Sequence, residues 1–403
     1  MTVSGDWRVP QVHIPRHPLW RNAYDGAWEL WQHSEPSVDD LCATVLFARY
    51  ANDVAPLHHL LDAARLAHAS PLVAWAEWEL YQITGDQIRL ATVLPDLSAN
   101  YEWFNFHRRR ASGLYWRTEH DSPRDAHEWV DVSAQQALAA ERIANSARAV
   151  GDAETARHYD VERQSLCALI NERSWNERAQ FYVDRRADGS LCDAKGSAGF
   201  WPLLAGVPSS AQAAALVRHL SDPREFWRVH VCPSLSADHP RYADRGAWWR
   251  GAVWPLDNYA LVKGLERYGY HELALRVADN HITTISHVFK ETQSLWDNYA
   301  PDYIEPGSMT RHDAVGTGVS AVALLLETIL GLRVDAPTNT LHWRPRLRET
   351  WAVEQFPIGR IRVNVSVTAE RATFIGSAPF RLHLITPDAE RWFTVRDELV
   401  VAA

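Results

Sequence analysis

The feature that most constrains this chain is a succession of helix-type segments joined by short turns, from about residue 37 to residue 335. One segment begins near Ser70, a residue type typical of helix N-termini, and ends at Gly85. Its apolar residues cover more than one face, as in a helix that is packed on two sides. The dipeptide Gly-Asp closes this segment at residues 85–86 and another at residues 151–152, which indicates repeated helix pairs. The pattern predicts an all-α architecture.

Two helical segments differ in the exposure that their composition predicts. Residues 133–150 are polar and rich in alanine, so we expect them on the solvent side, followed by a helix over residues 153–172. Residues 319–332 are apolar nearly all round, which places them in the inner layer of a double-layered toroid. This apolar run is too short to cross a bilayer, and it contains Glu327.

Period-two alternation identifies the strands. A hairpin is predicted from residues 180–185 and 190–195 around the turn at residues 187–189. Beyond Pro337, residues 360–368 and 380–385 alternate apolar and polar side chains. We therefore divide the chain into a helical domain over residues 1–335 and a small β-rich appendage over residues 336–403, with a structural role.

Composition limits the partners and the compartment. The net charge of −9 excludes a nucleic-acid backbone as the expected ligand, since that needs a basic face. The N-terminus lacks the basic and apolar regions of a signal peptide, and the spacing of the four cysteines matches no metal site. Reduced, independent thiols and a cytoplasmic location are expected. The excess of 19 tryptophans over 11 phenylalanines favours a carbohydrate cleft, because indole rings stack on sugars.

Two stretches carry the candidate chemistry. Residues 233–264 combine several tryptophans with Arg250, Gly251 and Asn258 just before a helix, and a glycine there lets backbone and guanidinium approach a ligand. Residues 292–302 place Asp297 among aromatic and amide side chains, where a carboxylate can act as a general base on water.

These stretches, together with residues 195–208 and 311–332, resemble the bacterial mannosylglycerate-hydrolase-like and trehalase-like glycoside hydrolases, and more distantly the processing α-glucosidases. The resemblance runs from about residue 70 to residue 333. It implies an (α/α)6 toroid of six helical hairpins whose active site lies at one mouth, and a small carbohydrate as the substrate. It implies no cofactor, and we expect no metal, nucleic-acid or membrane partner. The oligomeric state stays open.

The resemblance also implies roles for individual residues. The acid of the family motif "W-E-N-Y", the general base, corresponds to Asp297, and the general acid of "G-M-D-N-S-P-R" corresponds to Asp121. Inverting hydrolysis of an α-glycoside would follow, which needs two carboxyl groups roughly 6.5–9.5 Å apart. The predicted sugar-binding residues are Asp40, Trp116, Trp249, Arg250, Trp254, Asn258, Trp296, Tyr299 and His312.

Several departures from the family pattern fall on the chemistry. When the chain is aligned with the motif "G-M-D-N-S-P-R" without a gap, His120 stands at the position of the catalytic aspartate and Asp121 at that of the following asparagine. A one-residue deletion in the alignment places Asp121 at the position of the catalytic aspartate. The base is aspartate instead of glutamate. Ala314 and Thr317 stand where the relatives carry Phe and Trp, and Asp39 replaces a Trp. The sugar-contacting loop between the first two helix pairs is reduced to residues 61–70.

Three hypotheses follow from these departures. The first is a hydrolase with an unusual substrate. The second is a biosynthetic enzyme that reuses the fold for other acid/base chemistry, with His120 and Asp297 as its pair. The third is a sugar-binding homologue without catalysis. A carboxyl at position 121 facing Asp297 across a shared pocket would favour the first.

Overall fold

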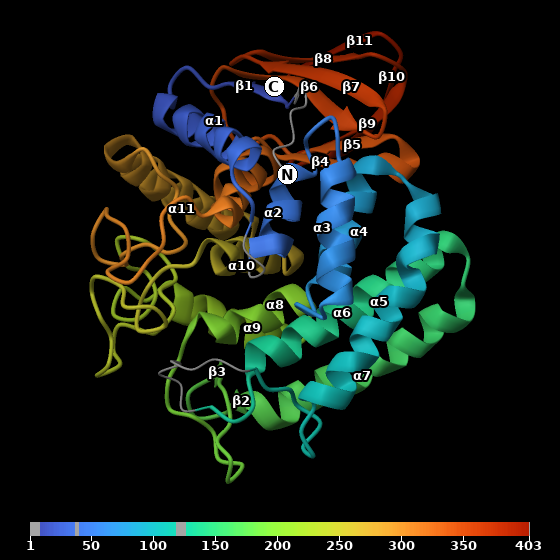
Figure 1. The fold of residues 1–403 in the computed structure, drawn as a ribbon. Helices are drawn as coiled ribbons and strands as arrows, with labels where there is room; N and C mark the ends of the chain where they lie inside the picture. The colour runs from blue at the N-terminus through green and yellow to red at the C-terminus, as the bar shows by residue number, and fades with distance from the viewer. Residues whose placement is uncertain (1–8, 37–39, 118–125, 403) are drawn as a thin grey trace.

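The computed structural model describes residues 9–36, 40–117 and 126–402. Helices fill most of the chain up to residue 329, and a C-terminal region of β-sheet gathers at one end of them (Figure 1). No helix within these ranges has the length and apolarity that a membrane crossing requires.

Two kinds of helix alternate along the chain. The set that we name core helices is mostly buried: α2 Leu41–Ala48, α4 Val73–Thr84, α6 Val130–Val150, α8 Trp201–Ala205, α10 Pro255–Arg267 and the π-helix η4 Val319–Ile329. The flanking helices are more exposed: α1 Pro18–His33, α3 Ala55–Leu66, α5 Gln87–Arg108, α7 Ala153–Ser174, α9 Ser210–Leu220 and α11 His271–Thr292. Short 3-10 turns are η2 Ser197–Phe200, η3 Val315–Thr317 and η5 Ala336–Thr338.

The core helices pack on one another in chain order. α2 contacts α4, and the series continues through α6, α8 and α10 to η4. η4 in turn contacts α2, although these two helices lie at opposite ends of the helical region. All six helices therefore share one apolar interior, with α2 and η4 buried on every face.

The predicted helix ends are confirmed where glycine ends a helix. Gly85 and Gly151 follow α4 and α6 with φ of +67° and +87°, a left-handed conformation that disfavours residues with a Cβ atom. η4 is buried throughout, as its apolar sequence predicts.

The solvent-side prediction for residues 133–150 is wrong. α6 is one of the most buried helices, and Ala137, Ala140 and Ala144 are completely inaccessible. Small side chains let neighbouring helices approach closely, so an alanine-rich sequence suits a crowded interior. Polar residues of the helix find hydrogen-bond partners; the Ser133 hydroxyl, for example, donates to the Trp129 carbonyl at 2.9 Å.

One helix lies upstream of the predicted helical region. α1 begins at Pro18, and its buried residues Trp20, Ala23, Tyr24 and Trp28 follow helical spacing. This periodicity is present in the sequence, before residue 37.

The C-terminal strands form two sheets. One has the order β1-β6-β7-β8-β11 and the other the order β10-β9-β5-β4, in which only the β5–β9 pair is parallel. Their bounds are β1 Gln11–His13, β4 Leu332–Asp335, β5 Thr340–Trp343, β6 Trp351–Ile358, β7 Ile361–Val367, β8 Arg371–Gly376, β9 Phe380–Ile385, β10 Glu390–Val395 and β11 Glu398–Ala402. The strands predicted over residues 360–368 and 380–385 are confirmed. β1, from the start of the chain, pairs with β6.

The predicted hairpin pairs differently. β3 Phe181–Tyr182 pairs with β2 Trp175–Asn176, while the turn at residues 187–189 closes only a single bridge between Arg185 and Leu191. Arg185 also bridges to Glu128, so three short segments meet here by single bridges and no continuous hairpin forms. The four cysteines are free, as expected.

Candidate active site

A cavity of about 680 Å³ lies where the core helices begin. Its lining includes Leu72 before α4, Asp131 in the first turn of α6, Asp257 in the first turn of α10 and Thr317 before η4. Several helix N-termini, each with a partial positive charge, thus face one space. Carboxylates in these first turns compensate that charge and can accept hydrogen bonds from sugar hydroxyls.

Indole rings form much of the cavity wall. Trp249 stacks on Trp254 with ring centroids 4.6 Å apart, and Trp248 lies 6.0 Å from Trp254 at a tilt. The Nε1 of Trp254 is buried without a hydrogen-bond partner, so it can donate to a bound molecule. The cavity is lined by the tryptophans at positions 103, 116, 201, 248, 249 and 254. Such a wall suits the apolar faces of sugar rings.

Of the aspartates that the structure describes, four face the cavity: Asp40, Asp131, Asp257 and Asp297. Asp257 is held by two donors, the hydroxyl of Ser197 at 2.5 Å and the indole N–H of Trp201 at 3.0 Å. These contacts orient the Asp257 carboxylate and stabilise its negative charge.

Asp297 is firmly oriented, with only 7% of its surface exposed. Its Oδ1 accepts from the Thr310 hydroxyl at 2.6 Å, the Asn298 amide at 2.8 Å and the Arg311 backbone N–H at 3.0 Å. Its Oδ2 accepts from Arg311 Nε at 2.9 Å. This set of donors fixes the orientation of the Asp297 carboxylate toward the cavity.

The structure brings together five of the predicted site residues, since Asp40, Trp116, Trp249, Trp254 and Asp297 all line the cavity. The remaining described ones lie away from the lining: Arg250, Asn258, Trp296, Tyr299 and His312. Asp121 and His120 lie outside the described residues. The described part of the chain therefore does not define the distance between the Asp121 and Asp297 carboxyl groups.

The residues away from the lining have local contacts. Asn258 is inaccessible and donates to the Val231 carbonyl at 3.3 Å. Tyr299 is equally buried, and its hydroxyl accepts from the Trp296 backbone N–H at 3.1 Å. Trp296 itself donates its indole N–H to Thr292.

The other two predicted sugar-binding residues outside the lining, His312 and Arg250, lie on the protein surface. His312 is exposed and pairs with Asp313 at 2.7 Å. Arg250 is also exposed. The expected role of Gly251 in approaching a ligand is wrong: with φ of +118°, a Cβ there would lie 2.7 Å from the Ala243 carbonyl oxygen. Gly251 therefore permits the loop to fold on itself.

The cavity also contains residues that the sequence analysis missed. Asp131 and Asp257 both stand in the first turn of a helix directly after tryptophan-containing loops, a local signal that could have identified them. Trp103 and Trp201 carried no such signal, because only helix packing turns them toward this space. Three arginines, Arg108, Arg117 and Arg311, add positive charge to the lining.

Among the described residues, no group of three or more His, Cys, Asp or Glu side chains is arranged to hold a metal ion. The chemistry of the lining is that of carboxylates, indoles and guanidinium groups.

A family model and several known proteins match this chain. The family model described as the mannosylglycerate hydrolase MGH1-like glycoside hydrolase domain matches residues 43–128 and 120–306. An uncharacterized protein of Borreliella burgdorferi is 26% identical over 336 residues, which cover 79% of this chain and 70% of that protein.

Two further similarities concern mannosylglycerate hydrolases. The enzyme of Thermus thermophilus is 34% identical over 121 residues, covering 30% of this chain and 29% of its own length. The chain thus matches under a third of that enzyme. A solved structure of a mannosylglycerate hydrolase from Thermus thermophilus in complex with glucose is 21% identical, with a TM-score of 0.53, over 63% of this chain and 74% of that one. This structural similarity concerns the fold.

Proposed function

This chain belongs to the family of mannosylglycerate hydrolase MGH1-like glycoside hydrolase domains, and we propose from that membership that it hydrolyses an α-glycosidic bond in a small sugar substrate. The observation that carries the proposal is the placement of Asp297: an oriented carboxylate in a cavity walled by tryptophans.

The proposed mechanism is inverting. Asp297 removes a proton from a water molecule, which attacks the anomeric carbon from the face opposite the leaving group. Asp121 donates a proton to the glycosidic oxygen. Support for Asp121 comes from its position four residues after Arg117, which lines the cavity, and from the family motif around it.

The proposed substrate carries a negatively charged aglycone. Arg108 and Arg117 line the cavity, and the Arg108 guanidinium lies 4.6 Å from the ring centroid of Trp116. A guanidinium held against an aromatic face suits a carboxylate. The Thermus thermophilus relative is named for an acidic mannoside, which supports the same class of substrate.

We also propose that the core and flanking helices form a closed (α/α)6 toroid of six helical hairpins. The alternation of buried and more exposed helices supports this closure, as does the contact between η4 and α2. The division into a helical domain, residues 1–335, and a C-terminal appendage, residues 336–403, is part of the same proposal.

The test is release of sugar from α-mannosylglycerate, compared with neutral methyl α-mannoside and α-glucosides. Asp297→Asn and Asp121→Asn should each lower kcat roughly 10²–10⁴-fold, while Asp388→Asn, an exposed aspartate on a sheet turn, should leave it unchanged. NMR should detect the β-anomer as the first product. If Asp121→Asn retains activity and His120→Ala abolishes it, the proposed acid is wrong.

A second candidate is a sugar-binding protein without turnover. The observation that favours it is the ion pair between Arg311 and Asp297, because the guanidinium occupies Oδ2, an oxygen that would otherwise accept a proton from water. Saturable sugar binding with no hydrolysis, unchanged in Asp297→Asn, would establish this candidate.

A further inference from the structure

A second cavity, of about 630 Å³, lies at the opposite ends of the same core helices. Glu79 in α4, Arg142 in α6, Lys263 in α10 and Thr328 in η4 all belong to the C-terminal halves of their helices and line it. The C-terminal sheet contributes the other side through β4, β5 and β9. The cavity is therefore separate from the candidate active site, which lies at the helix N-termini.

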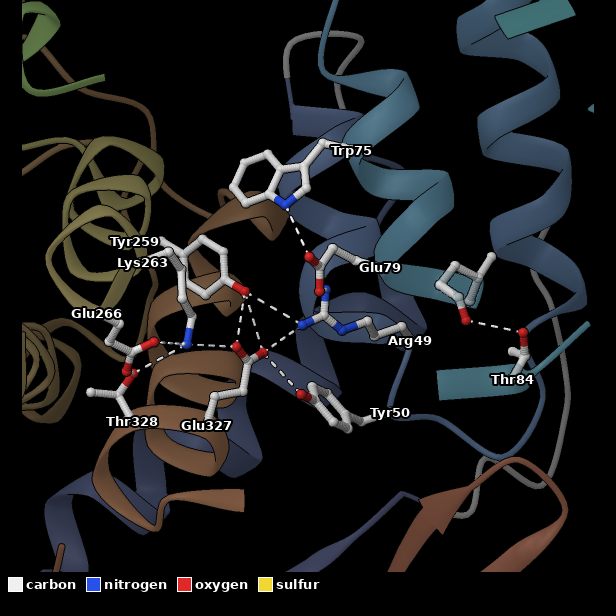
Figure 2. A network of polar contacts seen from close by, with 11 residues as sticks. Arg49, Tyr50, Trp75, Glu79, Thr84, Tyr259, Lys263, Glu266, Glu327 and Thr328 are labelled. Carbon is white, nitrogen blue, oxygen red and sulfur yellow. Dashed lines mark hydrogen bonds and ion pairs between the residues drawn. The ribbon is translucent and has the colours of Figure 1, made fainter. Parts of the chain in front are cut away.

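A buried ionic network forms one wall of this second cavity (Figure 2). Glu327 accepts from Arg49 at 2.6 Å and pairs with Lys263 at 2.8 Å. Lys263 also pairs with Glu266 at 3.1 Å, and Thr328 donates to Glu266 at 2.9 Å.

The other acids of the lining have partners too. Glu79 lies 3.3 Å from Arg49 and accepts from the Trp75 indole. Glu141 pairs with Arg267 at 2.6 Å. Asp335 accepts from the Thr338 hydroxyl at 2.6 Å. The five carboxylates of the lining are thus already satisfied by protein groups.

Three arginines of the lining lack such partners. Within the described chain, the guanidinium groups of Arg142, Arg333 and Arg344 donate no hydrogen bond, and the nearest carboxylate contact is Arg142 with Glu141 at 3.9 Å. The Nε of Arg142 is moreover buried and unpartnered. A guanidinium has five N–H donors and no acceptor, so three such groups present many unused donors to one cavity.

The three guanidinium groups also influence one another. Burial lowers the pKa of Arg142; attraction to Glu79 and Glu141 opposes this effect, and repulsion from Arg267 and Arg333 adds to it. Burial likewise lowers the pKa of Arg344, with repulsion from Arg346 and Arg333 adding to the effect and attraction to Glu266 and Glu390 opposing it. At Arg333 burial is outweighed by the surrounding carboxylates, which raise its pKa. The positive charges are therefore close enough to interact across the cavity, and a bound anion would relieve the repulsion on Arg142 and Arg344.

We propose that this second cavity binds a small oxyanion, a phosphate- or carboxylate-bearing metabolite, through Arg142, Arg333 and Arg344. Guanidinium groups bind phosphate and carboxylate oxygens in pairs of parallel hydrogen bonds. The volume lies within the range of small-molecule sites. None of the three arginines is a last-turn cation of its own helix, since Arg148 holds that place in α6 and Arg333 and Arg344 are not helical. The proposal is independent of the proposed function.

The test uses the purified chain of 403 residues. Calorimetry and thermal unfolding are measured with inorganic phosphate, glucose 6-phosphate and D-glycerate, each against sodium chloride of equal ionic strength and against glucose. At least one oxyanion should bind with a stoichiometry of one and raise Tm, and at equal concentration the tighter-binding oxyanion should raise Tm more. A phosphate-bearing ligand that binds more tightly than glycerate assigns the site to phosphate, and the reverse order assigns it to carboxylate.

Variants locate the binding. Arg333→Gln and Arg344→Gln should each weaken binding roughly 10-fold or more. Arg344→Gln should not lower the Tm of the ligand-free protein, since it removes a repelled charge. Arg371→Gln, an exposed arginine on β8, is the matched control and should bind normally.

Three outcomes would overturn the proposal. One is unaltered affinity in both variants, and another is binding that is lost only in Arg108→Gln of the candidate active site. The third is absence of binding by all three oxyanions at roughly 100-fold excess over the protein. Should Arg142→Gln fail to fold, the Arg333 and Arg344 variants still decide the question.

Discussion

The guanidinium of Arg49 lies 2.6 Å from the carboxylate of Glu327, although the two residues are 278 positions apart in the chain. Arg49 follows α2 and Glu327 stands in η4, so this ion pair joins two core helices from opposite ends of the helical region. Both side chains are almost inaccessible, at 2% and 4% exposure. Lys263 and the hydroxyls of Tyr50 and Tyr259 complete the shell around Glu327.

Glu327→Gln should lower the free energy of unfolding by about 3 kcal/mol, because it removes the buried counterion that Arg49 and Lys263 share. Among the described residues, Arg49 then keeps only Glu79, at 3.3 Å, and Lys263 keeps only Glu266, at 3.1 Å. Urea denaturation measures the change. Glu291→Gln removes an exposed pair with Lys290 and should cost under about 1 kcal/mol. Equal effects of the two substitutions would contradict the structural role of Glu327.

The shifted pKa of Glu327 leads us to expect a loss of folding stability in acid. Burial opposes its ionisation, but Lys263 and Arg49 outweigh burial and lower the pKa of Glu327 to about 2. An unfolded glutamate has a pKa of about 4.3, so the stabilisation is present above that pH and is lost as the pH falls from there toward about 2. Unfolding curves measured across this acidic range should show a steeper loss of stability in the wild type than in Glu327→Gln.

A buried histidine pair predicts a second pH dependence. His230 Nε2 lies 2.6 Å from His281 Nδ1, and His281 Nε2 lies 2.8 Å from the Ser320 hydroxyl. Burial lowers the pKa of His281 to about 3, and burial with repulsion from His281 lowers the pKa of His230. Below about pH 6.5 the unfolded chain binds protons at both rings and the folded chain does not. The free energy of unfolding therefore decreases as the pH falls below this value.

The measurement is the free energy of unfolding between pH 7.5 and pH 4.5. His281→Gln should flatten this profile, whereas His33→Gln, on the exposed end of α1, should leave its slope intact. If the free energy of unfolding depended on pH with the same slope in the wild type and in His281→Gln, the histidine pair would not be the source of that dependence.

Trp254 provides a test of the sugar cavity that does not depend on the proposed acid. Trp254→Phe keeps an aromatic face and removes the unpartnered N–H donor, so KM should rise about 2–10-fold. Trp254→Ala also removes the stacking partner of Trp249, and its KM should rise further. Steady-state kinetics on α-mannosylglycerate measures both changes. Trp392→Phe, on β10 outside the cavity, is the control and should change neither KM nor kcat.

Local signals in the sequence were sufficient for many elements of this protein. Gly85 and Gly151 end helices because their left-handed φ is encoded by residue type, and the alternation in residues 361–367 follows from one buried face of a strand. The motif residues Asp297 and Trp254 also stand where a cavity forms. These features depend on neighbours within a few residues, which the sequence displays directly.

Other features were decided only by the packing of distant segments. The alanine-rich α6 is buried because neighbouring core helices enclose it, and no local signal distinguishes that from a solvent-side helix. Asp131 and Asp257 share one cavity although they are far apart in the chain, and Arg142 meets Arg333 only because a C-terminal strand covers the helix ends. A residue's type and spacing determine its local conformation. Which charged side chains come together depends instead on which helices pack against one another. That packing is set by the free energy of the whole fold, which no short window of sequence contains.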